Sequence, residues 1–162
     1  MDLGNARRQE DDIVQECVLE LQRLGWRVLA SGAIQGTFRV ALSNGTVKAP
    51  DMVAFRSGTL LVGEAKQTAR GIFKSSQREL SDHEVISAIV TDDATRQRAI
   101  GRAESILQAQ GVFDAVHTVK GVLAAGTAFR DMADAVASPD VWCVEVDAAG
   151  AFHCTQGGGT RN

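Results

Sequence analysis

The sequence has 162 residues, the usual length of one domain, and its hydrophobic share of 44% and charged share of 23% are ordinary globular values. The net charge of -3 excludes a global basic field, so any contact with nucleic acid has to come from local charge. No stretch approaches the roughly 18 apolar residues of a membrane span, and the N-terminus lacks the apolar core of a signal peptide. We therefore expect a cytoplasmic protein with no membrane partner.

The first half of the chain predicts one helix followed by strands. Ile13, Cys17, Leu21 and Leu24 recur at helical spacing, and Gly25 is a typical helix stop. The segments that follow are rich in strand-forming residues and are separated by turn residues. The expected elements are a helix over residues 10–24 and strands over residues 26–31, 37–42, 49–56 and 59–67.

The second half predicts an alternation of helices and strands. Residues 70–81 are polar and indicate a loop or a frayed helix start. The remaining expected elements are helices over 82–89 and 94–110, a strand over 115–125, a helix over 127–137 and a last strand over 141–146. This order predicts one α/β domain over residues 1–155, a sandwich with a mixed central sheet flanked by helices, and a flexible tail over 156–162.

A hairpin in the middle of the chain carries the chemistry. A tight two-residue turn at Ser57-Gly58 sets the pairing of the strands on either side of it. Counting outward from that turn pairs Arg56 with Thr59, Phe55 with Leu60, Val53 with Val62 and Asp51 with Glu64. The two acids then lie opposite each other, with Cβ atoms about 4.5–5.5 Å apart. A three-residue turn would move one acid to the other face, so the register decides the site.

The charged end of this hairpin predicts a metal site. Side-chain alternation puts Asp51, Glu64 and Lys66 on one face, and both faces are otherwise apolar, so the hairpin is expected to be central in the sheet. Opposed carboxylates are costly, and a divalent cation relieves the cost. Two carboxylates, the backbone carbonyl of Ala65 and waters suit Mg²⁺ or Mn²⁺. With Lys66 placed to hold or deprotonate a water, the chemistry is phosphodiester hydrolysis.

Pro50-Asp51 followed by Glu64-Ala65-Lys66 resembles the PD-(D/E)XK nuclease superfamily, in particular its Holliday-junction resolvase-like and Mrr-like members. The resemblance covers about the first 125 residues. It implies a restriction endonuclease-like three-layer sandwich with the core order α-β-β-β-α-β, here followed by a C-terminal α-β extension. It also implies a further acid on the first helix that joins the metal and catalytic site, for which Glu16 fits best and Glu20 is the alternative.

The resemblance implies a Mg²⁺-dependent endodeoxyribonuclease that acts in restriction, phage defence or repair, as a homodimer or within a larger nuclease complex. Arg70, Lys74 and Arg78 follow the motif and are candidates for contacts with DNA phosphates, or form a solvated face. Two alternatives stay open. The chain is a catalytically weak or inactive module that binds DNA or a protein partner, or it is an unrelated α/β domain in which the motif is accidental.

Overall fold

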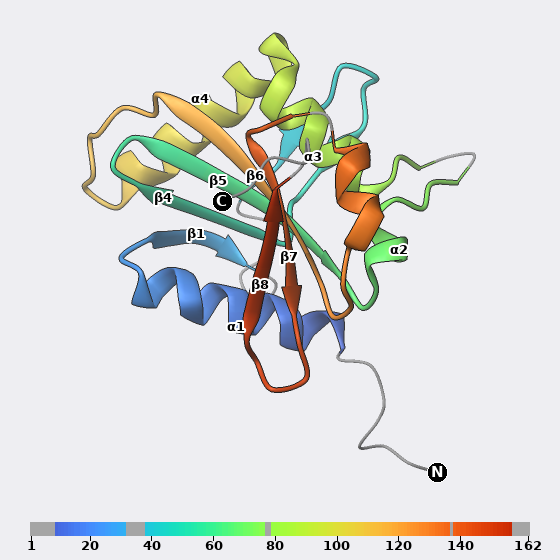
Figure 1. The fold of residues 1–162 in the computed structure, drawn as a ribbon. Coiled ribbons are helices and arrows are strands. Elements are labelled where there is room, and N and C mark those ends of the chain that lie inside the picture. Colours follow the sequence, from blue (N-terminus) through green and yellow to red (C-terminus); the bar gives the residue numbers. More distant parts are fainter. Residues whose placement is uncertain (1–8, 32–37, 77–78, 137, 157–162) are drawn as a thin grey trace.

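A mixed six-stranded sheet forms the centre of the computed structural model, which describes residues 9–31, 38–76, 79–136 and 138–156 (Figure 1). The strands lie in the order β1-β4-β5-β6-β7-β8. β5 and β6 pair in parallel, as do β6 and β7, and the other neighbours are antiparallel. The strands are β1 (Arg27–Ser31), β4 (Met52–Arg56), β5 (Thr59–Lys66), β6 (Thr118–Ala125), β7 (Val141–Val146) and β8 (Phe152–Gln156).

Helices cover both faces of this sheet, so the predicted α/β sandwich with a mixed central sheet is confirmed. Figure 1 shows α1 on one side of the sheet and α3 and α4 on the other. The helical segments are α1 (Glu10–Arg23), the one-turn α2 (Ala69–Ile72), α3 (Asp82–Thr91), α4 (Asp93–Ala109) and the 3₁₀ segment η3 (Arg130–Ala135). Each face of the sheet has its own hydrophobic cluster.

Local sequence signals explain where the helices begin. The Ser81 hydroxyl accepts a hydrogen bond from the Glu84 N–H, and the Glu84 carboxylate accepts one from the Ser81 N–H, which is a complete capping box for α3. The Asp92 carboxylate caps α4 by accepting a hydrogen bond of 3.0 Å from the Thr95 N–H. α1 begins without a side-chain cap, but three acids occupy its first turn, where the helix dipole favours negative charge.

The register of the β4–β5 hairpin is the one predicted from the sequence. Ser57 and Gly58 both have positive φ, 49° and 84°, as a two-residue hairpin turn requires. The observed pairs include Arg56 with Thr59, Phe55 with Leu60 and Val53 with Val62. Because β4 and β5 both have neighbours on either side, the hairpin is central, as expected.

The two faces of the hairpin pack against different helices. Val53, Phe55 and Val62 belong to the cluster shared with α3 and α4. Met52 and Leu61 belong to the cluster shared with α1. Each side chain on β4 or β5 therefore faces either α1 or the layer of α3 and α4, and this determines the surroundings of each site residue.

The predicted strand over residues 37–42 does not join the main sheet. Val40–Ala41 forms β2, which pairs with β3 (Val47–Lys48) in a separate two-stranded sheet beside α4. Phe38, Val40 and Leu42 are buried in alternation, so the pattern correctly indicated extended chain. The pattern did not specify the partner strand, and Thr37 lies outside the described residues.

Two predictions in the last third of the chain are wrong. The sequence predicts a helix over residues 127–137, but in the described part, 127–136, only the 3₁₀ segment over 130–135 forms. Arg130 has a positive φ of 49°, which no right-handed α-helix tolerates. The strand over 141–146 is not the last, because β8 pairs with β7 through a turn at Asp147–Gly150. Residues 157–162 of the predicted flexible tail lie outside the described residues.

None of the helices in the described ranges combines the length and the apolar composition that crossing a membrane requires.

Candidate active site

Asp51 and Glu64 meet at the open end of the β4–β5 hairpin. Asp51 directly precedes β4, and the adjacent register pair of Met52 with Gly63 places it next to Glu64. The Asp51 Oδ2 atom accepts a hydrogen bond of 2.9 Å from the backbone N–H of Ala65. That bond continues the pairing of the two strands through a side chain. It holds the Asp51 carboxyl against β5, at the end where Glu64 lies.

Glu64 is an acid in an environment that disfavours its charge. Its side chain is buried, with 9% relative exposure for the residue. Burial raises the pKa of Glu64 to about 10, and the charge of Asp51, a hydrogen bond with Asp51 and the charge of Asp82 act in the same direction, while Lys66 lowers it. A buried acid whose pKa is raised in this way is characteristic of functional sites.

Lys66 lies between two carboxylates that come from opposite helical layers. Its Nζ atom is 3.9 Å from Glu10 Oε1, in the first turn of α1, and 3.7 Å from Asp82 Oδ2, in the first turn of α3. Burial alone lowers the pKa of Lys66, but the charges of Asp82, Glu10, Asp51 and Glu64 together raise it above its usual value. Lys66 is therefore an ammonium group, which donates hydrogen bonds and positive charge.

Asp82 is a member of this cluster that the sequence did not reveal. Burial is the main cause that raises the pKa of Asp82 to about 6; Lys66 lowers it, and the charges of Asp51 and Glu10 raise it further. Its Oδ2 atom is buried and accepts no hydrogen bond from the described residues. No motif marked Asp82, because its only signal was its place at the start of a helix that follows the Glu64-Ala65-Lys66 strand.

The helix-borne acid beside Lys66 is Glu10, rather than Glu16 or Glu20. Each residue adds about 1.5 Å along a helix, so Glu16 lies about 9 Å further along α1 than Glu10. The Glu16 carboxylate instead lies at the β7–β8 turn, where its Oε1 atom is 3.2 Å from the place a Cβ of Gly150 would take. Glu20 pairs with Arg23 on the helix surface. Glu10 is therefore the acid of α1 that lies beside Lys66, and a part for Glu16 or Glu20 in a metal site stays a prediction.

The topology explains why the start of α1 reaches the site. A short connection at Gly25 reverses the chain from α1 into β1, so the start of α1 lies at the end of β1. The end of β1 pairs with the start of β4, where Asp51 lies. A hydrogen bond of 3.1 Å from Gln67 Nε2 to Gln9 Oε1 ties the end of β5 to the same place. The shortness of the α1–β1 connection was the sequence signal that favoured Glu10.

The donor set suits a hard divalent cation. In the described part of the chain, no three His, Cys, Asp or Glu side chains stand ready as a metal-binding group. Three observations nevertheless fit such an ion: the acidic side chains offer oxygen only, Asp51 and Glu64 share a buried place, and Asp82 Oδ2 has no hydrogen-bond donor. Oxygen donors of this kind are those that Mg²⁺ and Mn²⁺ prefer. The backbone carbonyl of Ala65 stays a predicted ligand.

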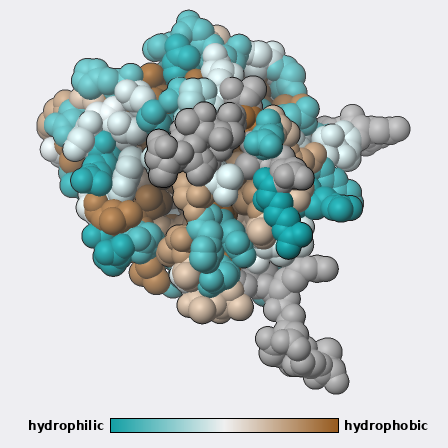
Figure 2. Space-filling view, in the orientation of Figure 1, coloured by the Kyte–Doolittle hydropathy of each residue, from teal (hydrophilic) through white to brown (hydrophobic). Residues whose placement is uncertain are grey.

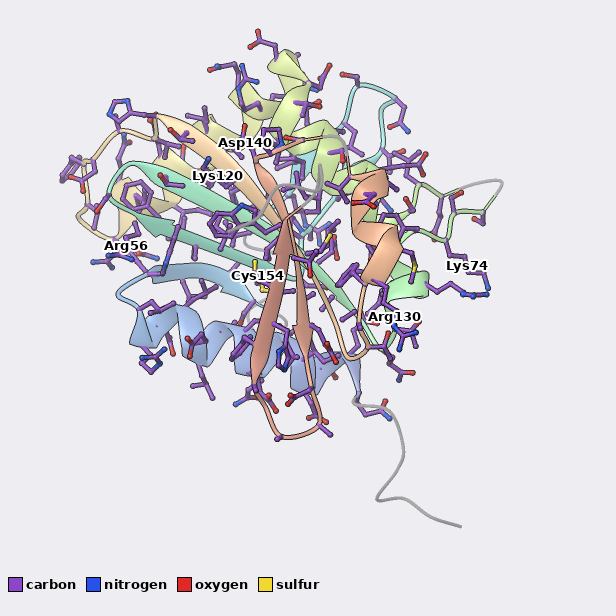
Figure 3. The ribbon with its side chains drawn as sticks, in the orientation of Figure 1. Arg56, Lys74, Lys120, Arg130, Asp140 and Cys154 are labelled. Carbon is purple, nitrogen blue, oxygen red and sulfur yellow. The ribbon has the colours of Figure 1, made fainter. Side chains whose placement is uncertain are left out.

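Basic side chains flank this end of the sheet. Arg70 in α2 and Lys74 just after it are both exposed, while Arg78 lies outside the described residues. α2 packs on the stem of Lys66, since a Cβ at Gly71 would lie 3.4 Å from Lys66 Cβ. Figure 3 shows Lys74 and Arg130 on the side of the molecule where α2 lies, and Arg56 on the opposite side. Arg130 is an exposed cation that the sequence did not single out.

Comparisons with known proteins identify no relative: no protein-family model matches the chain, and no curated protein or solved structure matches it significantly.

Proposed function

We propose that this chain is a Mg²⁺- or Mn²⁺-dependent endonuclease of the PD-(D/E)XK type that hydrolyses DNA phosphodiester bonds. The observation that carries the proposal is the meeting of Asp51 and Glu64 at the end of a central hairpin, with Lys66 one residue beyond Ala65. The order α1, β1, β4, β5, α3, β6 supports it too, because the resemblance implies a helix, three strands, a helix and a strand.

Asp51, Glu64 and the Ala65 carbonyl are the groups proposed to hold the cation. When bound, a divalent cation supplies Lewis acidity at the phosphate and a more acidic water molecule. Asp51 is already oriented by the hydrogen bond that its Oδ2 atom accepts from the Ala65 N–H. The raised pKa of Glu64 favours its neutral form, so a cation held by Glu64 would bind with release of the Glu64 proton.

Lys66 is proposed to stabilise the negative charge that develops on the phosphate and to hold the attacking water. Its raised pKa favours the charged form, so it acts as a donor rather than as a base. Glu10 and Asp82 are proposed as positioning residues, because they lie on either side of the Lys66 ammonium. They limit the directions in which its long, flexible side chain points.

Arg70 and Lys74 are proposed to contact DNA phosphates next to the cleaved bond, and Arg130 extends the same side of the molecule. Contacts of this kind set the position of the DNA without reading its sequence. They give the acidic protein the local positive charge that its overall composition lacks.

The test is cleavage of linear, supercoiled, single-stranded and four-way-junction DNA with Mg²⁺, Mn²⁺ or EDTA. Asp51→Asn and Lys66→Ala are expected to lower the rate at least about a hundredfold. The matched controls Asp114→Asn and Lys48→Ala change an exposed acid and a lysine of the small β2–β3 sheet, and are expected to cut like the wild type. Cutting that survives both site variants would refute the assignment.

If the folded protein cuts no DNA, measurements of metal binding and DNA binding distinguish the two remaining alternatives. Asp51-dependent binding of Mn²⁺, followed by calorimetry, together with binding of DNA would support the alternative of a nuclease-fold module without catalysis of its own. Absence of both metal binding and DNA binding would refute the nuclease proposal and leave an unrelated α/β domain.

A further inference from the structure

A cavity lies on the face of the sheet that α1 covers. Its volume is about 560 Å³, and it runs between the C-terminal half of α1 and the strands beside it. The strands contribute a floor of apolar side chains: Met52, Leu61, Val122, Trp142, Val144 and Phe152. Cys17 and Leu21 of α1, with Leu24 directly after the helix, form one wall. We call this cavity the α1 groove; Figure 2 shows brown, apolar surface exposed between α1 and the strands next to it.

The α1 groove exists because the two faces of the sheet are covered unequally. α3 and α4 lie along one face. On the other face α1 makes most of its contacts with β1, β4, β5 and β6, and parts of β7 and β8 stay exposed beside its C-terminal half. Trp142 on β7 is consequently 41% exposed and Leu24 is 44% exposed. Both tryptophans of the chain, Trp26 and Trp142, line the groove.

The charges at the groove point to an anion. Lys120 is paired with Asp140 at 2.8 Å, and Glu20 is paired with Arg23. Arg56, which also lines the groove, has no ion-pair partner within the described ranges. Figure 3 places Arg56 at one side of the molecule and Cys154, another lining residue, nearer its middle. One unpaired guanidinium at the end of an apolar trough complements a molecule with one anionic end.

We infer that the α1 groove binds an amphipathic carboxylate, with an elongated apolar body on the sheet floor and its carboxylate paired with Arg56. The volume lies within the range of about 300–1,000 Å³ that small-molecule sites occupy, and an apolar lining with few polar groups is typical of them. A guanidinium recognises a carboxylate through two parallel hydrogen bonds. This site is separate from Asp51 and Glu64, since Arg56 ends β4 and Asp51 precedes it.

The two tryptophans make the inference directly testable with dodecanoate as the probe. Titration of the full-length protein below the micelle concentration is expected to shift tryptophan emission to shorter wavelength and to saturate. Arg56→Gln is expected to weaken dodecanoate binding about tenfold while changing the affinity for dodecanol, which lacks the charge, less than twofold. The matched control Arg130→Gln removes an exposed arginine elsewhere and is expected to bind dodecanoate like the wild type.

A second variant tests the floor of the groove. Val144 is half-buried there, and Val144→Phe is expected to abolish saturation by filling space, with circular dichroism confirming that the variant folds. Equal affinities of wild type and Arg56→Gln for dodecanoate would overturn the inference. A second result would also overturn it: the wild type sediments as a dimer and binds no dodecanoate, and Trp142→Glu converts that dimer to a monomer. The groove would then be an interface between copies of the chain.

Discussion

At the scale of single residues, the candidate site contains an arrangement of acids that lowers the stability of the folded chain. Glu64 is buried next to Asp51, and the charge of Asp51 raises its pKa by more than the charge of Lys66 lowers it. Residues that serve only the fold are not arranged in this way, because opposed like charges destabilise a sheet. Substitutions at functional sites therefore often stabilise a protein while abolishing its activity.

The first prediction is that Glu64→Gln stabilises the metal-free protein. The folded state favours the protonated form of Glu64 and the unfolded state does not, so wild-type stability falls as the pH rises from about 4.5 towards 10. Glutamine has no proton to lose. In EDTA at pH 8 the variant is expected to unfold with a free energy more than about 1 kcal/mol higher than the wild type, and the difference is expected to grow with pH.

Urea denaturation at pH 6 and pH 9 measures this difference. Glu104→Gln is the matched control, because the Glu104 carboxylate has an ordinary structural role and accepts a hydrogen bond of 2.9 Å from the Val116 N–H. That variant is expected to be neutral or slightly less stable. A loss of stability in Glu64→Gln would mean that Glu64 supports the fold rather than a reaction.

At the scale of elements, the position of β6 against α3 depends on one glycine. A Cβ at Gly121 would lie 2.4 Å from Ile86 Cγ2, which is much shorter than any real contact. Gly121→Ala is therefore expected to push α3 away from β6 and to lower the unfolding free energy by about 1–3 kcal/mol. Because α3 carries Asp82, the same variant is also expected to weaken the positioning of Lys66.

Gly101 on α4 supplies the control for this second prediction. The same substitution there meets open space and improves helix propensity, so Gly101→Ala is expected to raise the unfolding free energy by about 0.5–1 kcal/mol. Midpoints of urea unfolding for the two variants are expected to move in opposite directions. Equal midpoints would show that β6 and α3 do not pack as closely as the structure indicates.

The elements also show how far the sequence alone reaches. The turn at Ser57-Gly58 predicts the register of its hairpin correctly, because a two-residue turn leaves one pairing only. Periodicity likewise predicts α1, α3 and α4. It failed for β2, whose buried alternation is real but whose partner is β3, and it missed β8, which follows a turn that its own side chains stabilise.

The acids around Lys66 could be identified only from the assembled fold. Glu10 and Asp82 lie far from Lys66 in the sequence and reach it only because α1 and α3 begin at the same end of the sheet. Spacing within one element predicts which side chains share a face, but not which helix end arrives beside them. A resemblance to known nucleases implied a helix-borne acid, and in the assembled fold Glu10 is the acid of α1 that lies beside Lys66.

At the scale of the whole molecule, the proposed function requires local positive charge in a protein whose net charge is negative. A net charge of -3 repels DNA at long range, so the proposed DNA binding requires cations that are gathered on one side. Arg70, Lys74 and Arg130 are exposed near the α2 end of the sheet, whereas Arg56 lies at the opposite side (Figure 3). The proposed orientation of DNA follows from this asymmetry and from the place of Asp51 and Glu64.

The third prediction is that the salt dependence of DNA binding reports each of these cations separately. A protein that neutralises a phosphate releases counterions, so the plot of log K against log salt has a negative slope. Removing one contact makes that slope shallower by about 0.9 for duplex DNA. Arg70→Gln, Lys74→Gln and Arg130→Gln are each expected to show this decrease, measured by fluorescence anisotropy in a Lys66→Ala background that prevents cleavage. Arg56→Gln, the same change on the far side, is expected to leave the slope as it was. If all four variants give one slope, DNA does not approach this end of the sheet, and the proposed binding face has to be abandoned even if Asp51 and Glu64 hold a metal.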